Sequence, residues 1–239
     1  MHTFYIPSIQ INKKIATVKG SEQHHLRNVL RLGHGDTIRI VDGKGSVCIG
    51  EIYKIDAEST EAEILSHEFH QRDTPSLTLF QGLPKYDKME LILEKTTELG
   101  VSQIAPMSTE RSLQEPSENR CERWHRVVLS ATKQCKRAWL PELCEMQQFE
   151  NCLNTLQKYA ISLIFWENEK EQHLKAVLRK APEVESIAFL VGPEGGFTDK
   201  EVDAAIENGC IPVTIGSNIL RTETAAIAGI TIAAYEYQI

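Results

Sequence analysis

Apolar segments of strand length alternate with amphipathic segments of helix length from residue 77 to the C-terminus, and this alternation constrains the fold most. The expected strands are 77–81, 101–107, 161–166, 187–191 and 211–215. The expected helices are 87–99, with Gly100 as its C-cap, 119–138, one near 170–180, 199–208 and 222–237. Parallel strands need a crossover connection that is usually a helix, so this order predicts a mostly parallel sheet covered by helices. Taken alone, the pattern predicts an unknotted, doubly wound α/β domain.

Two of the expected strands end in loops that contain glycine and acidic side chains. Leu190-Val-Gly-Pro-Glu-Gly-Gly-Phe197 closes one strand, and Ile215-Gly-Ser-Asn-Ile-Leu-Arg-Thr-Glu-Thr-Ala225 closes the other. Open α/β sheets bind ligands at such strand ends, and glycine lets a backbone approach a ligand closely. An ordinary turn between strand and helix explains either loop alone equally well. The occurrence of both favours a binding site.

Residues 1–70 are expected to form a small β-rich unit, joined by a linker at 71–76 to a second domain at 77–239. Alternating runs at 37–41, 46–53 and 60–65 predict strands, and Asp42-Gly-Lys-Gly45 predicts a hairpin turn. A helix is expected over Ser21–Arg31, with Ser21 as its N-cap and Leu26, Val29 and Leu30 facing inward. Its opposite stripe holds no acid: His24, Arg27, Asn28 and Arg31. This stripe suits either a solvated face or contact with phosphates.

The formal net charge is −7, which by itself disfavours a nucleic-acid partner, but the charge is unevenly distributed. Residues 111–140 carry seven positive and three negative charges, whereas the C-terminal part is acidic. The expected helix 119–138 has an apolar face and a second face with four positive side chains. The apolar face is Trp124, Val127, Val128, Ala131 and Cys135; the second is Arg123, Arg126, Ser130, Lys133 and Arg137. The helix therefore favours nucleic-acid or phosphate binding over a merely solvated surface.

The motifs of several chemistries are absent from the sequence. There is no P-loop, no G-x-G-x-x-G after a strand and no H-E-x-x-H. Six cysteines without a C-x-x-C pair are typical of free cytosolic thiols, and His24-His25 lacks further ligands at metal spacing, so no metal is expected. Since neither a signal peptide nor an apolar run of about 18 residues is present, we expect a cytoplasmic protein without a membrane partner. A crevice edged by Glu194, Arg221 and Glu223 suits transfer chemistry between two positioned substrates.

The final expected helix, 222–237, is rich in small residues: Ala225, Ala226, Ala228, Gly229, Ala233 and Ala234. Small side chains let another backbone come close, which predicts burial against a partner element or a second subunit. A plain core helix explains the same pattern.

Five segments in chain order resemble the RsmE family of SPOUT-class RNA methyltransferases. They include Gly192–Phe197, Ile219–Ala225 and His24-His-Leu-Arg-Asn-Val-Leu-Arg31. The run Lys85-Tyr-Asp-Lys-Met-Glu90 with Lys95-Thr-Thr-Glu-Leu-Gly-Val101 is similar to the family's first βα segment, and Trp124–Arg137 to its basic helix. The resemblance spans almost the whole chain.

This resemblance implies an enzyme that uses S-adenosylmethionine to methylate N3 of one uridine in 16S ribosomal RNA of the 30S subunit. It also implies an N-terminal PUA-like β-barrel, a SPOUT parallel-sheet domain with a C-terminal trefoil knot, and a homodimer with active sites at the subunit interface. Two other interpretations stay open. One is a non-catalytic RNA-binding protein with a degenerate transferase domain, and the other is a dinucleotide-dependent oxidoreductase, which the missing glycine motif disfavours.

The resemblance also assigns residues to roles. The residues that it assigns to cofactor binding are Gly192, Pro193, Glu194, Gly196, Ile215, Gly216, Ile219, Leu220, Thr224 and Ala225. Those assigned to RNA are His24, His25, Arg27, Arg31, Arg123, Arg126, Lys133, Lys136 and Arg137. Arg221 is expected to orient the uracil and stabilise its anion. Glu223 or Glu194 either removes the N3 proton or only holds its loop.

Two positions depart from the family's pattern. Asn218 stands where the family usually has an arginine, and Gln134-Cys-Lys-Arg137 replaces a run that commonly contains Ser-Gly. Both changes affect the expected contacts with RNA rather than the reaction type.

Overall fold

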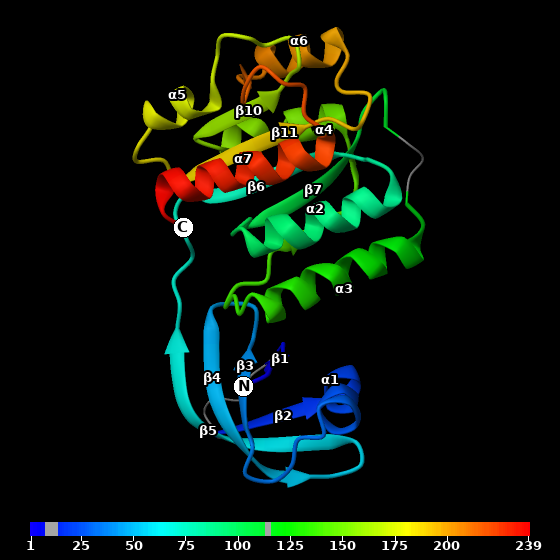
Figure 1. Cartoon of the computed structure of the whole chain (residues 1–239), viewed down its shortest axis with the longest axis vertical. Coiled ribbons are helices and arrows are strands. Elements are labelled where there is room, and N and C mark those ends of the chain that lie inside the picture. The colour runs from blue at the N-terminus through cyan, green and yellow to red at the C-terminus, as the bar shows by residue number, and fades with distance from the viewer. Residues whose placement is uncertain (8–13, 113–115) are drawn as a thin grey trace. The chain divides into compact units, whose positions relative to one another are not determined.

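The computed structural model describes residues 1–7, 14–112 and 116–239, and the chain in it divides into two compact units (Figure 1). The first unit comprises Met1–Arg72 together with Thr132–Leu140, and the second comprises Asp73–Ala131 together with Pro141–Ile239. The segment 132–140, which the sequence assigns to the second domain, thus groups with the first unit.

The first unit is built on a five-stranded sheet in the order β1-β3-β4-β5-β2. β1 pairs with β3 in parallel, and the other pairs are antiparallel. The strands are β1 (Thr3–Tyr5), β2 (Ile15–Lys19), β3 (Thr37–Val41), β4 (Ser46–Ile55) and β5 (Ser59–Phe69). Alternate side chains such as Ile38, Ile40 and Ile52 are fully buried in its core. The three predicted strands are confirmed, whereas β1 and β2 were not predicted.

The predicted hairpin turn connects β3 to β4. The Asp42 carboxylate accepts hydrogen bonds from the backbone N–H groups of Lys44 at 2.7 Å and Ser46 at 3.0 Å. Gly43 and Gly45 have φ angles of 71° and 100°, which an L side chain rarely adopts. The Asp-Gly-Lys-Gly sequence is therefore the local cause of the turn.

The helix expected over residues 21–31 is wrong in two respects. α1 (Gly20–His24) continues as a π-helical segment, η2 (His25–Val29), and Ser21 lies inside α1 rather than at its N-cap, which is Lys19. A π turn inserts one extra residue, so it rotates the following side chains away from the positions that a 3.6-residue period predicts. Leu26 is buried as expected, but Val29 is 59% exposed.

The second unit is built on a seven-stranded sheet in which every pairing is parallel (Figure 1). Its order is β12-β10-β11-β6-β7-β8, and β9 also pairs with β7. The strands are β6 (Ser76–Gly82), β7 (Gln103–Ser108), β8 (Glu142–Leu143), β9 (Gln147–Gln148), β10 (Ile161–Phe165), β11 (Ser186–Val191) and β12 (Ile211–Val213). The predicted parallel sheet is confirmed, and the two-residue strands β8 and β9 were not predicted. The implied trefoil knot stays a prediction.

The helices that lie near the predicted positions are α2 (Tyr86–Glu98), α3 (Glu118–Gln134), α5 (Leu174–Arg179), α6 (Asp199–Glu207) and α7 (Thr222–Tyr237). The short helices α4 (Phe149–Leu153) and η3 (Leu156–Lys158) were not predicted. α3 ends four residues earlier than predicted, because Lys136 adopts a left-handed φ of 60°. In the described part of the chain, no helix is long and apolar enough to cross a membrane.

α7 packs inside the second unit, beside α2 and against β6 and β11 (Figure 1). Its buried positions include most of its small residues. A Cβ at Gly229 would lie 2.8 Å from the Phe165 ring, which stacks on Phe189 with centroids 6.2 Å apart. Packing against a partner element of the same chain therefore accounts for Gly229.

Candidate functional site

A cavity of about 640 Å³ lies in the second unit, where the loops after β10, β11 and β12 meet the start of α7. Ligand sites of open α/β sheets occur at this edge, outside the carboxyl ends of the strands. Its wall includes Phe165–Glu167, Val191–Gly196 and Val213–Thr222, together with Lys88, Lys170 and Ala225. The structure thus brings together the two loops that the sequence singled out.

All but one of the residues predicted to bind a cofactor line this cavity. They are Gly192, Pro193, Glu194, Gly196, Ile215, Gly216, Ile219, Leu220 and Ala225. Thr224 is exposed on the first turn of α7 and is not part of the wall. Asn218, the departure from the family pattern, is part of it.

Glycine is required where the backbones at this edge come close. A Cβ at Gly82 would lie 2.7 Å from the Pro193 ring, so the end of β6 touches the loop after β11. Gly196 has a φ of 69°, and a Cβ there would lie 2.9 Å from the carboxylate of Glu167. A larger residue at Gly82 would push the loop out of place, and one at Gly196 would strain the backbone because of its positive φ.

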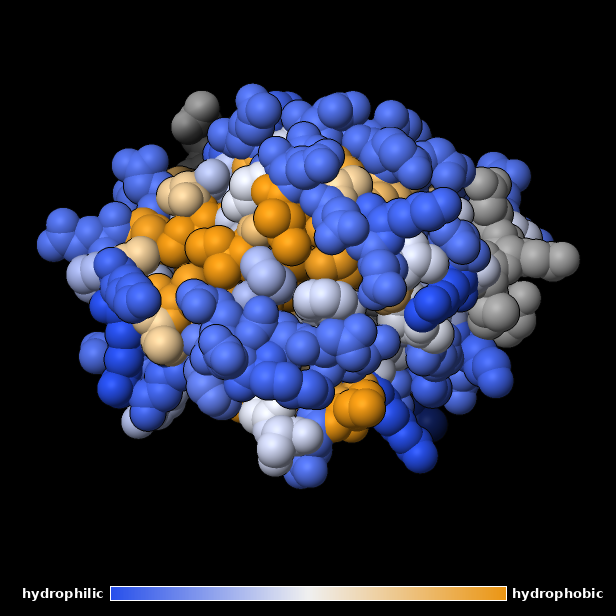
Figure 2. All heavy atoms as spheres, turned by 90° about the horizontal axis from the view of Figure 1, so that it is seen from above, coloured by the Kyte–Doolittle hydropathy of each residue, from blue (hydrophilic) through white to orange (hydrophobic). Residues whose placement is uncertain are grey.

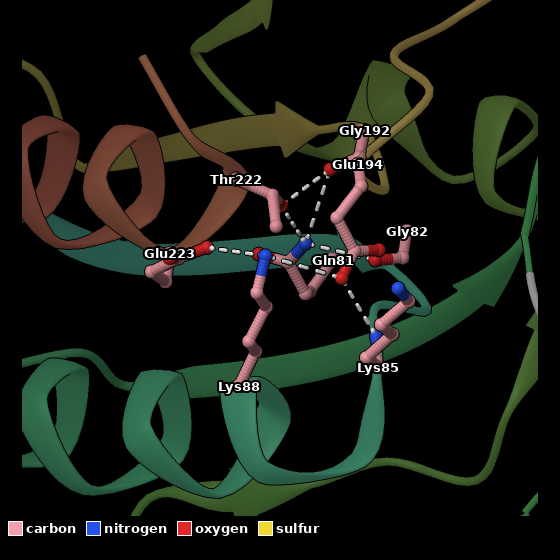
Figure 3. Close-up of polar contacts among 8 residues, drawn as sticks. All are labelled: Gln81, Gly82, Lys85, Lys88, Gly192, Glu194, Thr222 and Glu223. Carbon is pink, nitrogen blue, oxygen red and sulfur yellow. Dashed lines mark hydrogen bonds and ion pairs between the residues drawn. The ribbon is translucent and has the colours of Figure 1, made fainter.

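Gln81, at the end of β6, holds the cavity's loop to the start of α7 (Figure 3). Its fully buried amide nitrogen donates to the Gly82 carbonyl at 2.8 Å and to the Thr222 hydroxyl at 2.9 Å. The Thr222 hydroxyl in turn donates to the Gly192 carbonyl at 2.5 Å. Sequence analysis did not identify Gln81, although a glutamine that ends an apolar strand was a signal.

Lys88, on the first turn of α2, lies between two carboxylates (Figure 3). Its Nζ is 3.3 Å from Glu194 and 3.4 Å from Glu223. The same Glu194 oxygen accepts a hydrogen bond of 3.1 Å from the backbone N–H of Lys85. The carboxylates come from the loop after β11 and from α7, so Lys88 joins three segments that are distant in sequence.

The charges of this cluster stabilise one another. Burial alone would raise the pKa of Glu194, but the Lys85 N–H and the Lys88 ammonium outweigh it, and the pKa lies below 4.5. Burial likewise opposes the charge of Lys88, yet its carboxylate partners hold its pKa above 10.5. Both groups are therefore ionised at neutral pH.

Arg221 lies immediately before α7 and lines the cavity. Its side chain is exposed, and within the described residues it makes no ion pair. An arginine without an ion pair in the cavity wall can contact an anionic or carbonyl-bearing ligand.

The residues predicted to bind RNA are mostly exposed, but some are paired. His24, His25, Arg27 and Arg31 are exposed in the first unit, and Arg126 and Lys136 are exposed at α3 and just beyond it. Arg123 pairs with Glu90 at 2.7 Å, and Lys133 pairs with Glu22 at 2.6 Å. Arg137 is half-buried. The basic face of α3 is therefore partly neutralised.

Within the described ranges, no group of three or more His, Cys, Asp or Glu side chains could hold a metal ion.

Comparisons with known proteins identify the class. The model of an RNA methyltransferase domain matches residues 71–234, and that of an RNA methyltransferase PUA domain matches residues 18–65. The chain belongs to this RNA methyltransferase family.

Similar proteins within this family bear the name ribosomal RNA small subunit methyltransferase E. A protein of that name from Synechocystis is 35% identical over 218 residues, which cover 90% of this chain and 71% of the relative. The crystal structure of the Neisseria gonorrhoeae protein of that name, bound to S-adenosyl methionine, has a TM-score of 0.88 at 32% identity and covers 98% and 97% of the two chains. A Legionella pneumophila methyltransferase with the bound cofactor SAM has a TM-score of 0.85 at 25% identity, covering 98% and 96%.

Proposed function

We propose that the protein transfers the methyl group of S-adenosylmethionine to N3 of one uridine in 16S ribosomal RNA. The observation that carries this proposal is the cavity walled by Val191–Gly196 and Val213–Thr222. Its volume suits a ligand of the cofactor's size, since such sites typically span about 300–1,000 Å³. The SAM-bound relatives of the same fold support the same cofactor.

The walls of the cavity favour recognition of the cofactor by backbone groups. Gly192, Gly196 and Gly216 carry no side chain, so the backbone of these walls can approach a ligand closely, and Ile219 and Leu220 offer apolar contact. This combination suits the adenine ring, which has polar edges and apolar faces.

The reaction requires that uracil N3 lose its proton before or during transfer. N3 then attacks the methyl carbon, an N–C bond forms while the C–S bond breaks, and S-adenosylhomocysteine leaves. We assign to Arg221 the orientation of the uracil and stabilisation of its anion, because Arg221 lines the cavity and makes no ion pair among the described residues. The lowered pKa of Glu194 makes its carboxylate a weak proton acceptor, which argues against Glu194 as the base.

The test is a methyl-transfer assay with labelled S-adenosylmethionine and 30S subunits from cells that lack their own enzyme. We expect label at N3 of a single 16S uridine. R221A and E223Q should each reduce turnover by about 10²-fold or more while the fold stays intact. Full turnover by both variants would contradict the roles of these residues. Cofactor binding without transfer to any ribosomal RNA would contradict the proposed reaction, and absence of both would favour the non-catalytic RNA-binding interpretation.

We also propose that the protein works in the cytoplasm as a homodimer through the second unit. A second cavity of about 570 Å³ is lined by residues of α5 and α7, and it shares Thr214 and Ile215 with the first. Tyr235 and Ile219 are 83% and 78% exposed, and Figure 2, which looks onto the second unit, shows a broad hydrophobic patch on this face, besides smaller hydrophobic groups. Patches of this kind mark protein interfaces.

Light scattering on the purified protein tests the dimer. Tyr235→Glu should shift the mass from dimer to monomer, because it places a charge in the apolar contact. The matched control is Leu91→Glu, at an exposed apolar residue of α2 outside the second cavity. A monomeric wild type, or a Tyr235→Glu variant that stays dimeric, would contradict this proposal.

A further inference from the structure

Lys88 is the one side chain drawn in Figure 3 that makes ion pairs with both α7 and the loop after β11. Glu194 belongs to the loop that forms one wall of the cavity. Glu223 belongs to the first turn of α7, directly after the segment that forms the other wall. The ammonium therefore connects both walls to α2.

The burial of this cluster makes the connection effective. The exposed fractions of the side chains of Lys88, Glu194 and Glu223 are 24%, 28% and 13%. Charges that are largely withdrawn from water are less screened than surface pairs. Without the ammonium, two carboxylates would face each other across the cavity's edge and repel.

We propose that Lys88 is a positioning residue, which holds the loop after β11 and the start of α7 at the separation that binds S-adenosylmethionine. The same contact fixes the first turn of α7, and with it Arg221 immediately before that turn. This inference rests on the proposed function of the cavity. It assigns to α2 a role in the cofactor site, because Lys88 lines the cavity and, among the α2 side chains that the structure describes, no other one does.

The experiment compares variants of the full-length protein by calorimetric titration with S-adenosylmethionine and by steady-state methyl transfer. Lys88→Met removes the charge and keeps much of the side-chain length. Lys88→Arg keeps a cation whose planar fork can contact two carboxylates. The matched control is Lys95→Met, since Lys95 also lies on α2 and also pairs with two carboxylates, Glu94 at 2.6 Å and Glu98 at 3.0 Å.

Lys88→Met should raise the dissociation constant of the cofactor by about tenfold or more, with a larger effect on the KM for cofactor than on the KM for RNA. Lys88→Arg should stay within about threefold of wild type, and Lys95→Met should bind as wild type does. A residue that only supported the fold would lower the melting temperature and affect both KM values alike.

The combined variant tests whether Lys88 acts through its partners. If it does, Lys88→Met with Glu223→Gln should bind the cofactor no more weakly than Lys88→Met alone, because the repulsion has been removed. The proposal would be overturned if Lys88→Met bound the cofactor with wild-type affinity. It would also be overturned if a folded Lys88→Arg bound the cofactor as weakly as Lys88→Met does.

A second comparison of cofactor binding tests the proposal if Lys88→Met fails to fold. If Lys88→Met does not fold, the proposal requires near-native binding by Lys88→Arg and weaker binding by Glu194→Gln and Glu223→Gln, and the opposite order overturns it. Failure of the proposed function is distinguishable, because the wild type itself would then not bind the cofactor or transfer its methyl group.

Discussion

Thr222 has a hydrogen-bonding role that only one arrangement of its partners allows. Its hydroxyl has one hydrogen, which it donates to the Gly192 carbonyl, so it must accept from the amide nitrogen of Gln81. The same nitrogen donates to the Gly82 carbonyl, which fixes the orientation of the Gln81 amide. A single buried hydroxyl thus joins β6, the loop after β11 and α7.

Thr222→Val should destabilise the protein by about 1–3 kcal/mol, because a buried carbonyl and a buried amide hydrogen lose their partner. Urea unfolding and cofactor titration measure the two consequences, and affinity should fall with stability. Thr222→Ser is the control, since it keeps the hydroxyl. A Val variant as stable as the Ser variant would refute the role of this hydrogen bond.

Glu194 makes part of the free energy of unfolding dependent on pH. Its pKa is lowered in the folded protein, so its contribution is fully present above 4.5, the ordinary carboxyl value, and is lost as pH falls through the lower folded pKa. The stability difference between wild type and Glu194→Gln should therefore be constant near neutral pH and shrink in acid. Denaturant unfolding between about pH 7 and pH 3 measures it. A difference that grows in acid would show the opposite sign of the shift.

At the scale of elements, α7 combines a strong local pattern with a packing constraint. Glycine in a helix costs roughly 1 kcal/mol relative to alanine, so helix propensity alone favours Gly229→Ala. The added Cβ would meet the Phe165 ring at 2.8 Å, and that ring has Phe189 behind it. Overpacking a filled core costs about 1–3 kcal/mol, so packing should outweigh propensity.

We therefore expect Gly229→Ala to lower the free energy of unfolding by about 1 kcal/mol, measured by chemical denaturation. Phe165→Leu in the same chain should relieve part of the loss, because it makes room for the Cβ. In a double-mutant cycle, a favourable coupling energy between Gly229→Ala and Phe165→Leu would show that contact with the Phe165 ring causes the loss of stability. A Gly229→Ala variant more stable than wild type would mean that the ring moves aside at little cost.

At the scale of the whole molecule, a net charge of −7 has to be reconciled with an RNA partner. The basic side chains of α3 do not contribute equally, since Glu90 neutralises Arg123 whereas Arg126 is exposed. Counterion release depends on the cations that are free to contact phosphates. Local charge, not the net value, should therefore govern the association.

Binding to 16S RNA should weaken steeply as salt rises. Arg126→Ala should reduce the slope of log K against log salt by about 0.7–0.9, one phosphate contact, and Arg123→Ala by less. Lys200→Ala, at an exposed cation of α6, is the control. Filter binding over a series of salt concentrations provides the measurement, and a flat response would exclude α3 as an RNA surface.

The sequence by itself determined the features that depend on neighbouring residues. The period of apolar residues predicted five strands of the parallel sheet, all but β8 and β9, and both ends of α7. The Asp42–Gly45 turn followed from residues that favour positive φ. The two glycine-containing loops indicated where the cavity lies, because strand ends in such sheets meet at one edge.

Only the tertiary structure decided which distant groups meet. Gln81 and Thr222 are 141 residues apart, and they meet because β11 pairs with β6 and α7 packs on both. Lys88 acquires its partners for the same reason, and the π turn at η2 displaces Val29 against the local period. Hydrophobic periodicity shows which face of an element is buried. It carries no information on which element covers that face, since burial of apolar surface is non-directional.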